Sequence, residues 1–349
     1  MKPKPETRPA GISRRTFLKA SLLGGGAMAL AAAAPARPRS AQPDSPTPPP
    51  PDSLHEGHGD DSGTMGEVDL IAFDPTTFVT NFDGGKVTAL GGGRSLREWE
   101  VVALNKDIEV APGVFFPAWT FNGQVPGPTF RAREGDQLRF HFTNGSSHAH
   151  TIHFHGIHPP SMDGVDPIVE PGGEFIYEFE ARPFGLHLYH CHVMPLKRHI
   201  HKGLYGAFII DPPGGRSPAR ELVMVMNAFD TNFDSANEVY AVNTVAFHYA
   251  RHPIQVKVGE PVRVYLVNIT EFDLVNSFHL HASMFRLYRT GTNLEQFEFT
   301  DIVTMGQGER HVLEFTLEHP GLFMFHAHQS EFAELGWMGM FEATPEEAS

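Results

Sequence analysis

The chain has 349 residues, of which 41% are hydrophobic and 19% charged, and its formal net charge at pH 7 is −14. This length suggests about two domains of roughly 150 residues each, and the composition is that of a globular protein rather than a disordered one. The acidic balance argues against nucleic acid as a partner. A single cysteine, Cys191, excludes intrachain disulfides and multi-cysteine metal sites. Histidine, with 21 residues, is the most informative residue type.

The N-terminus carries the features of an export signal. Arg14 and Arg15 precede a mildly apolar, glycine-containing stretch over residues 20–34, which small residues follow. This stretch is too short to cross a membrane comfortably. The arginine pair resembles a twin-arginine signal, which exports folded proteins. We therefore expect residues 1–41 to be removed, leaving a periplasmic or extracellular protein with no stable membrane insertion.

The next segment, residues 42–66, predicts an extended, solvated linker. Four consecutive prolines, Pro48 to Pro51, stand in it among Thr, Ser and Asp residues. Such a segment has too little apolar content to form a core of its own.

From about residue 96 onward the pattern predicts β-strands and little helix. Short runs rich in Val, Phe, Ile and Tyr alternate with period two and are separated by Gly, Pro, Asn and Asp. The clearest runs are residues 137–142, 174–179, 262–267 and 311–316. The predicted fold class is therefore all-β, built as sandwiches or barrels.

Two stretches of this strand-rich region repeat one another. In each, a His-x-His pair is followed some 35 to 50 residues later by a second pair, and the copies are 126 and 136 residues apart. The pairs are His153 and His155, His190 and His192, His279 and His281, and His326 and His328. The repeat indicates two copies of one domain, which we place at residues 67–212 and 213–349.

The paired histidines predict metal ligation. On a strand, residues i and i+2 point to the same face, so each pair presents two imidazoles together. A single histidine is more often an ordinary surface or core residue than a ligand. Four such pairs, duplicated across two domains, argue against that ordinary role. Eight neutral imidazoles suit Cu, Zn, Fe or Ni.

Cys191 predicts a second kind of metal site. It points away from His190 and His192, toward the face that also carries His150, and His199 follows downstream. One thiolate and two imidazoles with a weak or absent axial ligand describe a blue-copper electron-transfer site. Leu204 stands where an axial Met is usual, so we expect a high reduction potential. The second domain has Asn276 and Ala327 at the positions of His150 and Cys191 and lacks this site.

These motifs resemble those of multicopper oxidases. The resemblance rests on His190-Cys-His192, His153-Phe-His155-Gly and the segment from Trp119 to Pro128, and it covers roughly residues 97–345. It is nearest to the two-domain, laccase-like branch with a type 1 copper in the first domain. The resemblance implies two tandem cupredoxin-like Greek-key β-sandwich domains. The segments 199–204 and 332–336 also resemble copper nitrite reductases, which are built from the same duplication.

Two departures separate the chain from a nitrite reductase. Those enzymes have an aspartate where His153 stands and a non-ligand where His192 stands, and three histidines hold their single type 2 copper. Eight histidines fit a trinuclear cluster, so the resemblance implies about four coppers per subunit: one type 1, one type 2 and two type 3. It also implies that His155 and His281, or their pair-mates, hold the type 2 ion; the division stays open.

The resemblance further implies an activity and an assembly. Single electrons would enter at the type 1 copper and pass from Cys191 to the histidines on either side, and dioxygen would be reduced to two waters. Asp163, in the family's Asp-Gly position, and Glu331, just beyond His328, are candidates for the proton relay. In the family, a homotrimer forms each cluster between domain 1 of one chain and domain 2 of the next.

Four functions remain open at this point. The chain could oxidise phenols, aromatic amines or similar small reductants, or be a metallo-oxidase for Cu(I) or Fe(II). The acidic surface permits the metallo-oxidase, but the 12 methionines form no Met-rich insertion. A nitrite reductase is disfavoured by His153 and His192. A copper carrier without turnover is disfavoured because an electron shuttle needs only the blue site.

Overall fold

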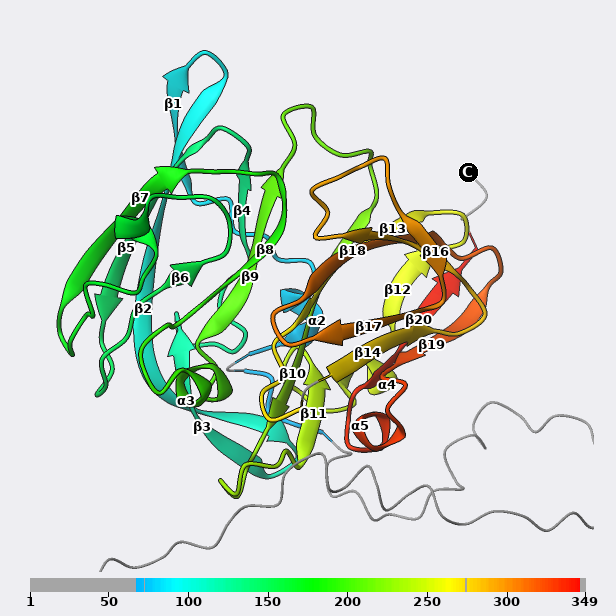
Figure 1. Ribbon diagram of the computed structural model, residues 1–349. Coiled ribbons are helices and arrows are strands. Elements are labelled where there is room, and N and C mark those ends of the chain that lie inside the picture. The colour runs from blue at the N-terminus through cyan, green and yellow to red at the C-terminus, as the bar shows by residue number, and fades with distance from the viewer. Residues whose placement is uncertain (1–66, 72, 274, 346–349) are drawn as a thin grey trace, which may run out of the picture. The chain divides into compact units, whose positions relative to one another are not determined.

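The computed structural model describes residues 67–71, 73–273 and 275–345, all within one compact unit (Figure 1). The predicted export signal and linker, residues 1–41 and 42–66, lie outside this part of the chain. Four sheets and five short helical segments make up the described residues. None of the helices in these ranges is both long and apolar enough to cross a membrane.

The first sandwich is formed by two sheets of domain 1. The first sheet has the order β1-β2-β5-β7, with β3 also paired to β2, and the second has the order β4-β9-β8-β6. Burial alternates residue by residue along β5, as expected for a strand with one face on a core. The strands are β1 (Lys86–Gly91), β2 (Arg94–Ala111), β3 (Val114–Phe121), β4 (Phe130–Arg133), β5 (Gln137–Asn144), β6 (His153–Phe154), β7 (Glu174–Glu180), β8 (Gly185–His190) and β9 (Tyr205–Asp211).

The second sandwich repeats this plan with a six-stranded and a five-stranded sheet. Their orders are β11-β10-β13-β18-β15-β16 and β12-β20-β19-β14-β17. The strands are β10 (Arg220–Phe229), β11 (Val239–Val242), β12 (Ile254–Lys257), β13 (Pro261–Asn268), β14 (Val275–Leu280), β15 (Phe285–Arg289), β16 (Glu298–Thr300), β17 (Ile302–Gly306), β18 (Arg310–Thr316), β19 (Gly321–His326) and β20 (Met338–Thr344). The all-β prediction is therefore confirmed.

Strand structure starts earlier than the sequence pattern indicates, at Lys86 instead of about residue 96. All six residues of β1 are exposed, so burial does not alternate along this strand as it does along a strand with one face on a core. Helices are confined to short connections: α2 (Pro75–Phe78), η2 (Pro160–Met162), α3 (Leu196–His201), α4 (His248–Arg251) and α5 (Ser330–Glu334).

The two sandwiches share a hydrophobic core where they meet. Leu188 and Ile209 of domain 1 pack in one buried cluster with Val225 and Tyr265 of domain 2. Contacts of β8 with β18 and of β9 with β10 join the same region. Because close-packed interiors deform little, this shared core fixes the metal-binding residues of the two domains relative to each other.

Candidate metal centres

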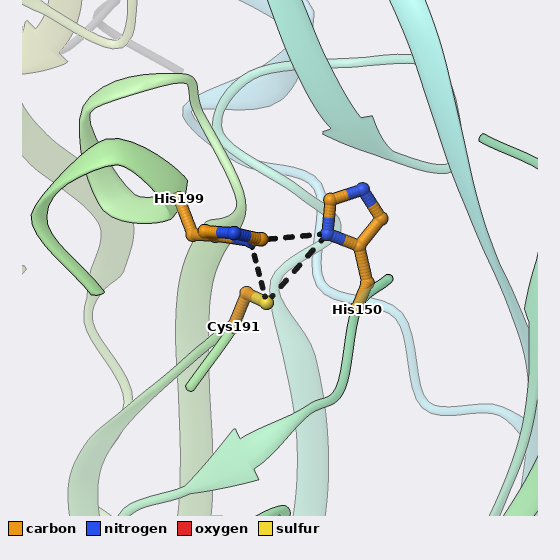
Figure 2. Close-up of side chains that lie close together, drawn as sticks. All are labelled: His150, Cys191 and His199. Atoms are coloured by element: carbon orange, nitrogen blue, oxygen red, sulfur yellow. Dashed lines mark hydrogen bonds between the residues drawn. The ribbon is translucent and has the colours of Figure 1, made fainter. Parts of the chain in front are cut away.

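Three buried side chains converge in the first sandwich: His150, Cys191 and His199 (Figure 2). The Sγ atom of Cys191 lies 3.2 Å from Nδ1 of His199 and 3.7 Å from Nδ1 of His150, and the two Nδ1 atoms are 3.1 Å apart. One sulfur and two nitrogen donors facing one another form the donor set of a blue-copper site. The structure thus brings together the three residues that the sequence predicted.

Local backbone structure fixes each of these three ligands. Cys191 directly follows β8, and its N–H donates to the carbonyl of Leu204 at 3.0 Å. His199 lies on α3, the short helix that brings the chain back toward the cysteine. The N–H of His150 donates to the carbonyl of Val169 at 3.0 Å, which ties the segment before β6 in place.

Burial sets the protonation state of the site. Desolvation lowers the pKa of His150 to about 3 and the pKa of His199 to about 4. Desolvation also raises the pKa of the Cys191 thiol to about 11, although neighbouring backbone N–H groups favour the thiolate. At neutral pH the imidazoles are uncharged with free lone pairs, and the thiol holds its proton until a metal displaces it.

Apolar and aromatic groups surround the three ligands. Leu204 is fully buried in the same hydrophobic cluster as Cys191 and offers no donor atom in its side chain. Its place at the axial position stays a prediction. The ring of Trp119 lies 5.2 Å from that of His150 and 4.9 Å from that of His199, between centroids. These groups restrict the access of water to the ligands.

A second histidine group lies at the pairing of β6 with β8. His153 and His190 are cross-strand partners, and Nε2 of His155 lies 3.3 Å from Nε2 of His190. The ring of His192 is 5.2 Å from that of His153. Burial lowers the pKa of His155 to about 3 and that of His190 to about 4, so both are neutral ligands at physiological pH.

A third histidine group repeats this arrangement in domain 2. His279 of β14 and His326 of β19 are cross-strand partners, and Nε2 of His281 lies 2.8 Å from Nε2 of His326. The ring of His328 is 5.4 Å from that of His279. Burial again lowers the pKa of His281 and of His326. The duplication seen in the sequence is therefore also a duplication of geometry.

Backbone carbonyls orient the rings in both groups. Nδ1 of His190 donates to the carbonyl of Cys191 at 2.9 Å, and Nδ1 of His326 donates to that of Ala327 at 2.6 Å. A histidine that donates from Nδ1 keeps its lone pair on Nε2, where it can bind a metal. The hydrogen bonds thus prepare one of the two facing Nε2 atoms in each group, that of His190 and that of His326.

An aspartate supports the first histidine of each group. Nδ1 of His153 donates to the carbonyl of Asp163 at 2.8 Å, and the Asp163 carboxylate lies 3.1 Å from the same nitrogen. In domain 2, Nδ1 of His279 donates to the carbonyl of Asp301 at 2.9 Å. The sequence interpretation missed Asp301, because Asp163 was found from its Asp-Gly motif whereas Asp301 is followed by Ile302.

Glu331 is not brought to the histidines in the same way. It lies on α5 and is exposed, and among residues 67–345 that the structure describes, its carboxylate makes no hydrogen bond or ion pair with a histidine. Its role in proton transfer stays a prediction with no contact to support it.

The two histidine groups remain apart within one chain. Among the described residues, no histidine ring of the domain 1 group stacks on or hydrogen-bonds with a ring of the domain 2 group. The domain 2 group is also more open to solvent, since His281 and His328 are exposed. Each group presents half of the eight predicted ligands.

The second domain uses the position of His150 for structure instead of metal binding. Asn276 is fully buried there, donates to Thr270 Oγ1 at 3.3 Å, and accepts from the N–H of Ser277 at 2.8 Å. With Ala327 in place of the cysteine, this sandwich has no thiolate to offer.

Comparison with known proteins agrees with this geometry. Two family models described as multicopper oxidase match residues 105–215 and 216–347. The crystal structure of a multicopper oxidase is 53% identical to this chain with a TM-score of 0.77, covering 78% of this chain and 98% of that one. The copper nitrite reductase of Nitrosomonas europaea is 27% identical with a TM-score of 0.64, covering 72% and 96%.

A nitrite reductase is also among the relatives that match by sequence. The copper-containing nitrite reductase of Neisseria gonorrhoeae is 29% identical over 241 residues, which are 63% of this chain. The chain spans about 61% of the length of that relative. The relatives therefore include both oxidases and nitrite reductases.

We predict that copper binding at the His150–Cys191–His199 site depends on pH. Because the pKa of Cys191 is about 11 and those of the two histidines are about 3 and 4, copper uptake near pH 7 displaces one thiol proton. The apparent affinity should rise about tenfold per pH unit between pH 5.5 and 8. Titration against a competing chelator, corrected for the chelator's own protonation, measures this slope.

The matched control is Cys191→Ser. It should lose the blue absorption and the pH slope while the histidine groups keep binding copper. An affinity for the blue site that stays flat across this pH range would contradict the assignment.

Proposed function

Because this chain belongs to the multicopper oxidase family, we propose that it is an exported oxidase that couples one-electron oxidation of a small reductant to reduction of dioxygen to water. Its two sandwiches are cupredoxin domains, and its metal is copper. Phenols, aromatic amines or similar compounds are the proposed donors.

The observation that carries the proposal is the duplicated histidine group. Both domains place a cross-strand histidine pair beside a third imidazole, whose Nε2 lies 3.3 Å from Nε2 of one member of the pair in domain 1 and 2.8 Å in domain 2. A protein that only shuttled electrons would need the cysteine site alone. Two matching groups with eight imidazoles supply the ligands of a multinuclear cluster, with His153 and His192 among them.

The residues fit copper by their chemistry. His150, Cys191 and His199 offer a soft sulfur and two nitrogens that converge in a buried position. When bound, copper supplies one-electron redox chemistry at this site and, at the histidine groups, electrons for the reduction of dioxygen.

The chain itself provides a short covalent route between the two kinds of site. Cys191 is joined through its backbone to His190 and His192, and its carbonyl accepts the Nδ1–H of His190 at 2.9 Å. The cysteine is fully buried and His190 is 7% exposed. Electrons entering at the sulfur thus have a protected path to the histidine group.

The acidic residue beside this group is Asp163. Its carbonyl holds the ring of His153, and its carboxylate lies 3.1 Å from Nδ1 of the same ring. We assign Asp163 to proton delivery toward the site of dioxygen reduction.

Because the two histidine groups lie apart within one chain, a cluster that uses both needs a second copy of the chain. We propose a homotrimer in which the domain 1 group of one chain meets the domain 2 group of the next. The separation of the groups within one chain and the exposure of His281 and His328 support it. The paired arginines near the N-terminus support a periplasmic or extracellular location.

A nitrite reductase is the second candidate, because a relative with that name is 29% identical to this chain. The presence of His153 and His192 favours the oxidase. A metallo-oxidase acting on Cu(I) or Fe(II) remains a variant of the same proposal with a different donor.

We predict that about half of the copper in the fully loaded protein is silent in electron paramagnetic resonance, because two of about four ions are coupled as a type 3 pair. Spin quantification against total copper tests this, together with oxygen uptake in the presence of a phenolic donor. If all of the copper is visible, at about two ions per chain, and nitrite is consumed instead, the nitrite reductase reading replaces this one.

We predict that Asp163→Asn slows oxygen reduction on the order of a hundredfold. The carbonyl that holds His153 is retained in this variant, so the loss reports on the carboxylate alone. Anaerobic reduction of the blue site by the donor should keep its wild-type rate. Asp166→Asn, a change at an exposed position of the same loop, is the control. Equal turnover and equal pH profiles in the two variants would remove Asp163 from the proposal.

We predict that two inactive variants restore activity when mixed within one trimer. His153→Ala/His155→Ala lacks the domain 1 group, and His279→Ala/His281→Ala lacks the domain 2 group. With random mixing in a cyclic trimer, about a quarter of the clusters should be intact. Co-expression followed by oxygen uptake measures this. A monomer in sedimentation, or no recovery on mixing, would rule out the shared cluster.

A further inference from the structure

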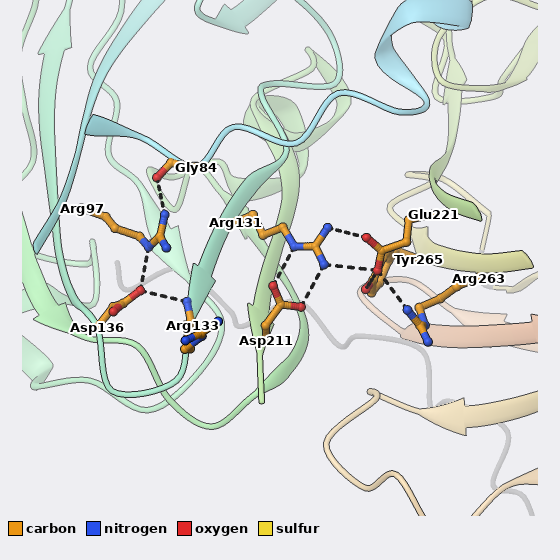
Figure 3. Close-up of polar contacts among 9 residues, drawn as sticks. All are labelled: Gly84, Arg97, Arg131, Arg133, Asp136, Asp211, Glu221, Arg263 and Tyr265. Atoms are coloured by element: carbon orange, nitrogen blue, oxygen red, sulfur yellow. Dashed lines mark hydrogen bonds and ion pairs between the residues drawn. The ribbon is translucent and has the colours of Figure 1, made fainter. Parts of the chain in front are cut away.

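An arginine-lined pocket lies where the two sandwiches meet, among the residues drawn in Figure 3. Its volume is about 320 Å³. Domain 1, the connecting segment and domain 2 all contribute to its wall, and Ser217 and Pro218 at its margin are exposed to solvent. Its charged lining residues are Arg131, Arg133, Asp211, Arg216, Glu221 and Arg263. Four arginines in one place are unusual in a chain with a net charge of −14.

Two of these arginines are fully engaged by carboxylates. Arg131 binds both oxygens of Asp211, at 2.7 and 3.0 Å, and both oxygens of Glu221, at 2.6 and 3.2 Å. Arg263 binds Glu221 at 3.1 Å and Glu314 at 2.6 Å. Burial alone would lower the pKa of Arg131 and of Arg263, but these carboxylates raise both. This chain of ion pairs connects domain 1 to domain 2 and accounts for these two arginines.

The other two arginines differ because no carboxylate of the described residues binds them directly, although Asp211 and Glu314 act on Arg216 from a greater distance. In the part of the chain that the structure describes, neither Arg133 nor Arg216 forms an ion pair. The terminal nitrogen Nη2 of Arg216 donates to the carbonyl of Gly291 at 2.8 Å. The Nε–H of the same side chain is buried without a hydrogen-bond partner among the described residues. Burial lowers the pKa of Arg216. A guanidinium nevertheless stays charged at any ordinary pH.

A buried donor on an unpaired cation carries a free-energy cost that an anionic ligand would remove. Guanidinium groups match the paired oxygens of phosphate, sulfate and carboxylate in geometry. The rest of the acidic surface repels such anions. A pocket with two guanidinium groups that no carboxylate in the described part of the chain binds is therefore a place on this acidic protein that attracts such anions.

We propose that this pocket binds a small oxyanion, held by Arg133 from the first domain and Arg216 from the connecting segment. Bound there, the anion extends the line of ion pairs formed by Arg131 and Arg263 and stabilises the junction between the sandwiches. The site lies outside the metal groups and does not depend on the proposed oxidase activity.

Thermal unfolding and titration calorimetry of the copper-loaded protein with inorganic phosphate test this proposal. Ionic strength is kept constant with chloride, and sulfate and succinate are run in parallel to separate tetrahedral anions from carboxylates. Wild-type protein should show a saturable rise in Tm, because a ligand that binds only the folded state stabilises it. Arg133→Gln/Arg216→Gln should raise the measured Kd for phosphate by at least about tenfold.

The matched control is Arg94→Gln, which removes an arginine that is exposed like Arg133 but lies outside the pocket, on the β1–β2 hairpin. It should keep the wild-type response to phosphate. A circular-dichroism spectrum like that of the wild type shows that the double variant is folded. Phosphate and sulfate also stabilise proteins by exclusion from their surfaces. An equal rise in Tm in the double variant, or no saturable heat with the wild type, would overturn the proposal.

Discussion

The alternation of side chains along an extended backbone is the constraint on which both kinds of metal site depend. At the end of β8, His190 and His192 point to one side, and Cys191, between them, points to the other. The sulfur therefore meets His150 and His199 inside the sandwich, while the imidazoles meet His153 and His155 at its edge. Three consecutive residues thus serve two centres. A shift of one residue in the register of β8 would exchange the two faces and disrupt both sites.

Sequence periodicity was sufficient to identify this arrangement because its elements are local. The His-x-His pairs and the opposed cysteine follow from spacing on a strand, and His199 comes from the short helix α3 just downstream; the structure brings them together. Asp301 could not be found in this way, since it reaches His279 through the pairing of β14 with β17 and not through a fixed sequence distance. The arginine pocket also depends on packing, because Arg133 and Arg216 come from different segments that only the folded junction brings together.

The two domains have kept different parts of one ancestral plan. Both retain the cross-strand pairing of histidines, His153 with His190 and His279 with His326. Only the first retains the sulfur site. In the second, Asn276 satisfies the polarity of the corresponding buried position through hydrogen bonds to Thr270 and Ser277. A buried polar group without such partners would destabilise the sandwich, so these hydrogen bonds stabilise the position where the first domain has His150.

Protonation also explains how the cysteine site can form before copper arrives. The pKa values of His150 and His199, about 3 and 4, leave both rings neutral at pH 7, and the pKa of Cys191, about 11, leaves the thiol neutral as well. The copper-free site therefore holds no unpaired buried charge, the most expensive kind of burial. Its ligands are instead held by backbone hydrogen bonds and by the surrounding hydrophobic cluster. Burying the three side chains therefore does not require a metal to neutralise a charge at this site.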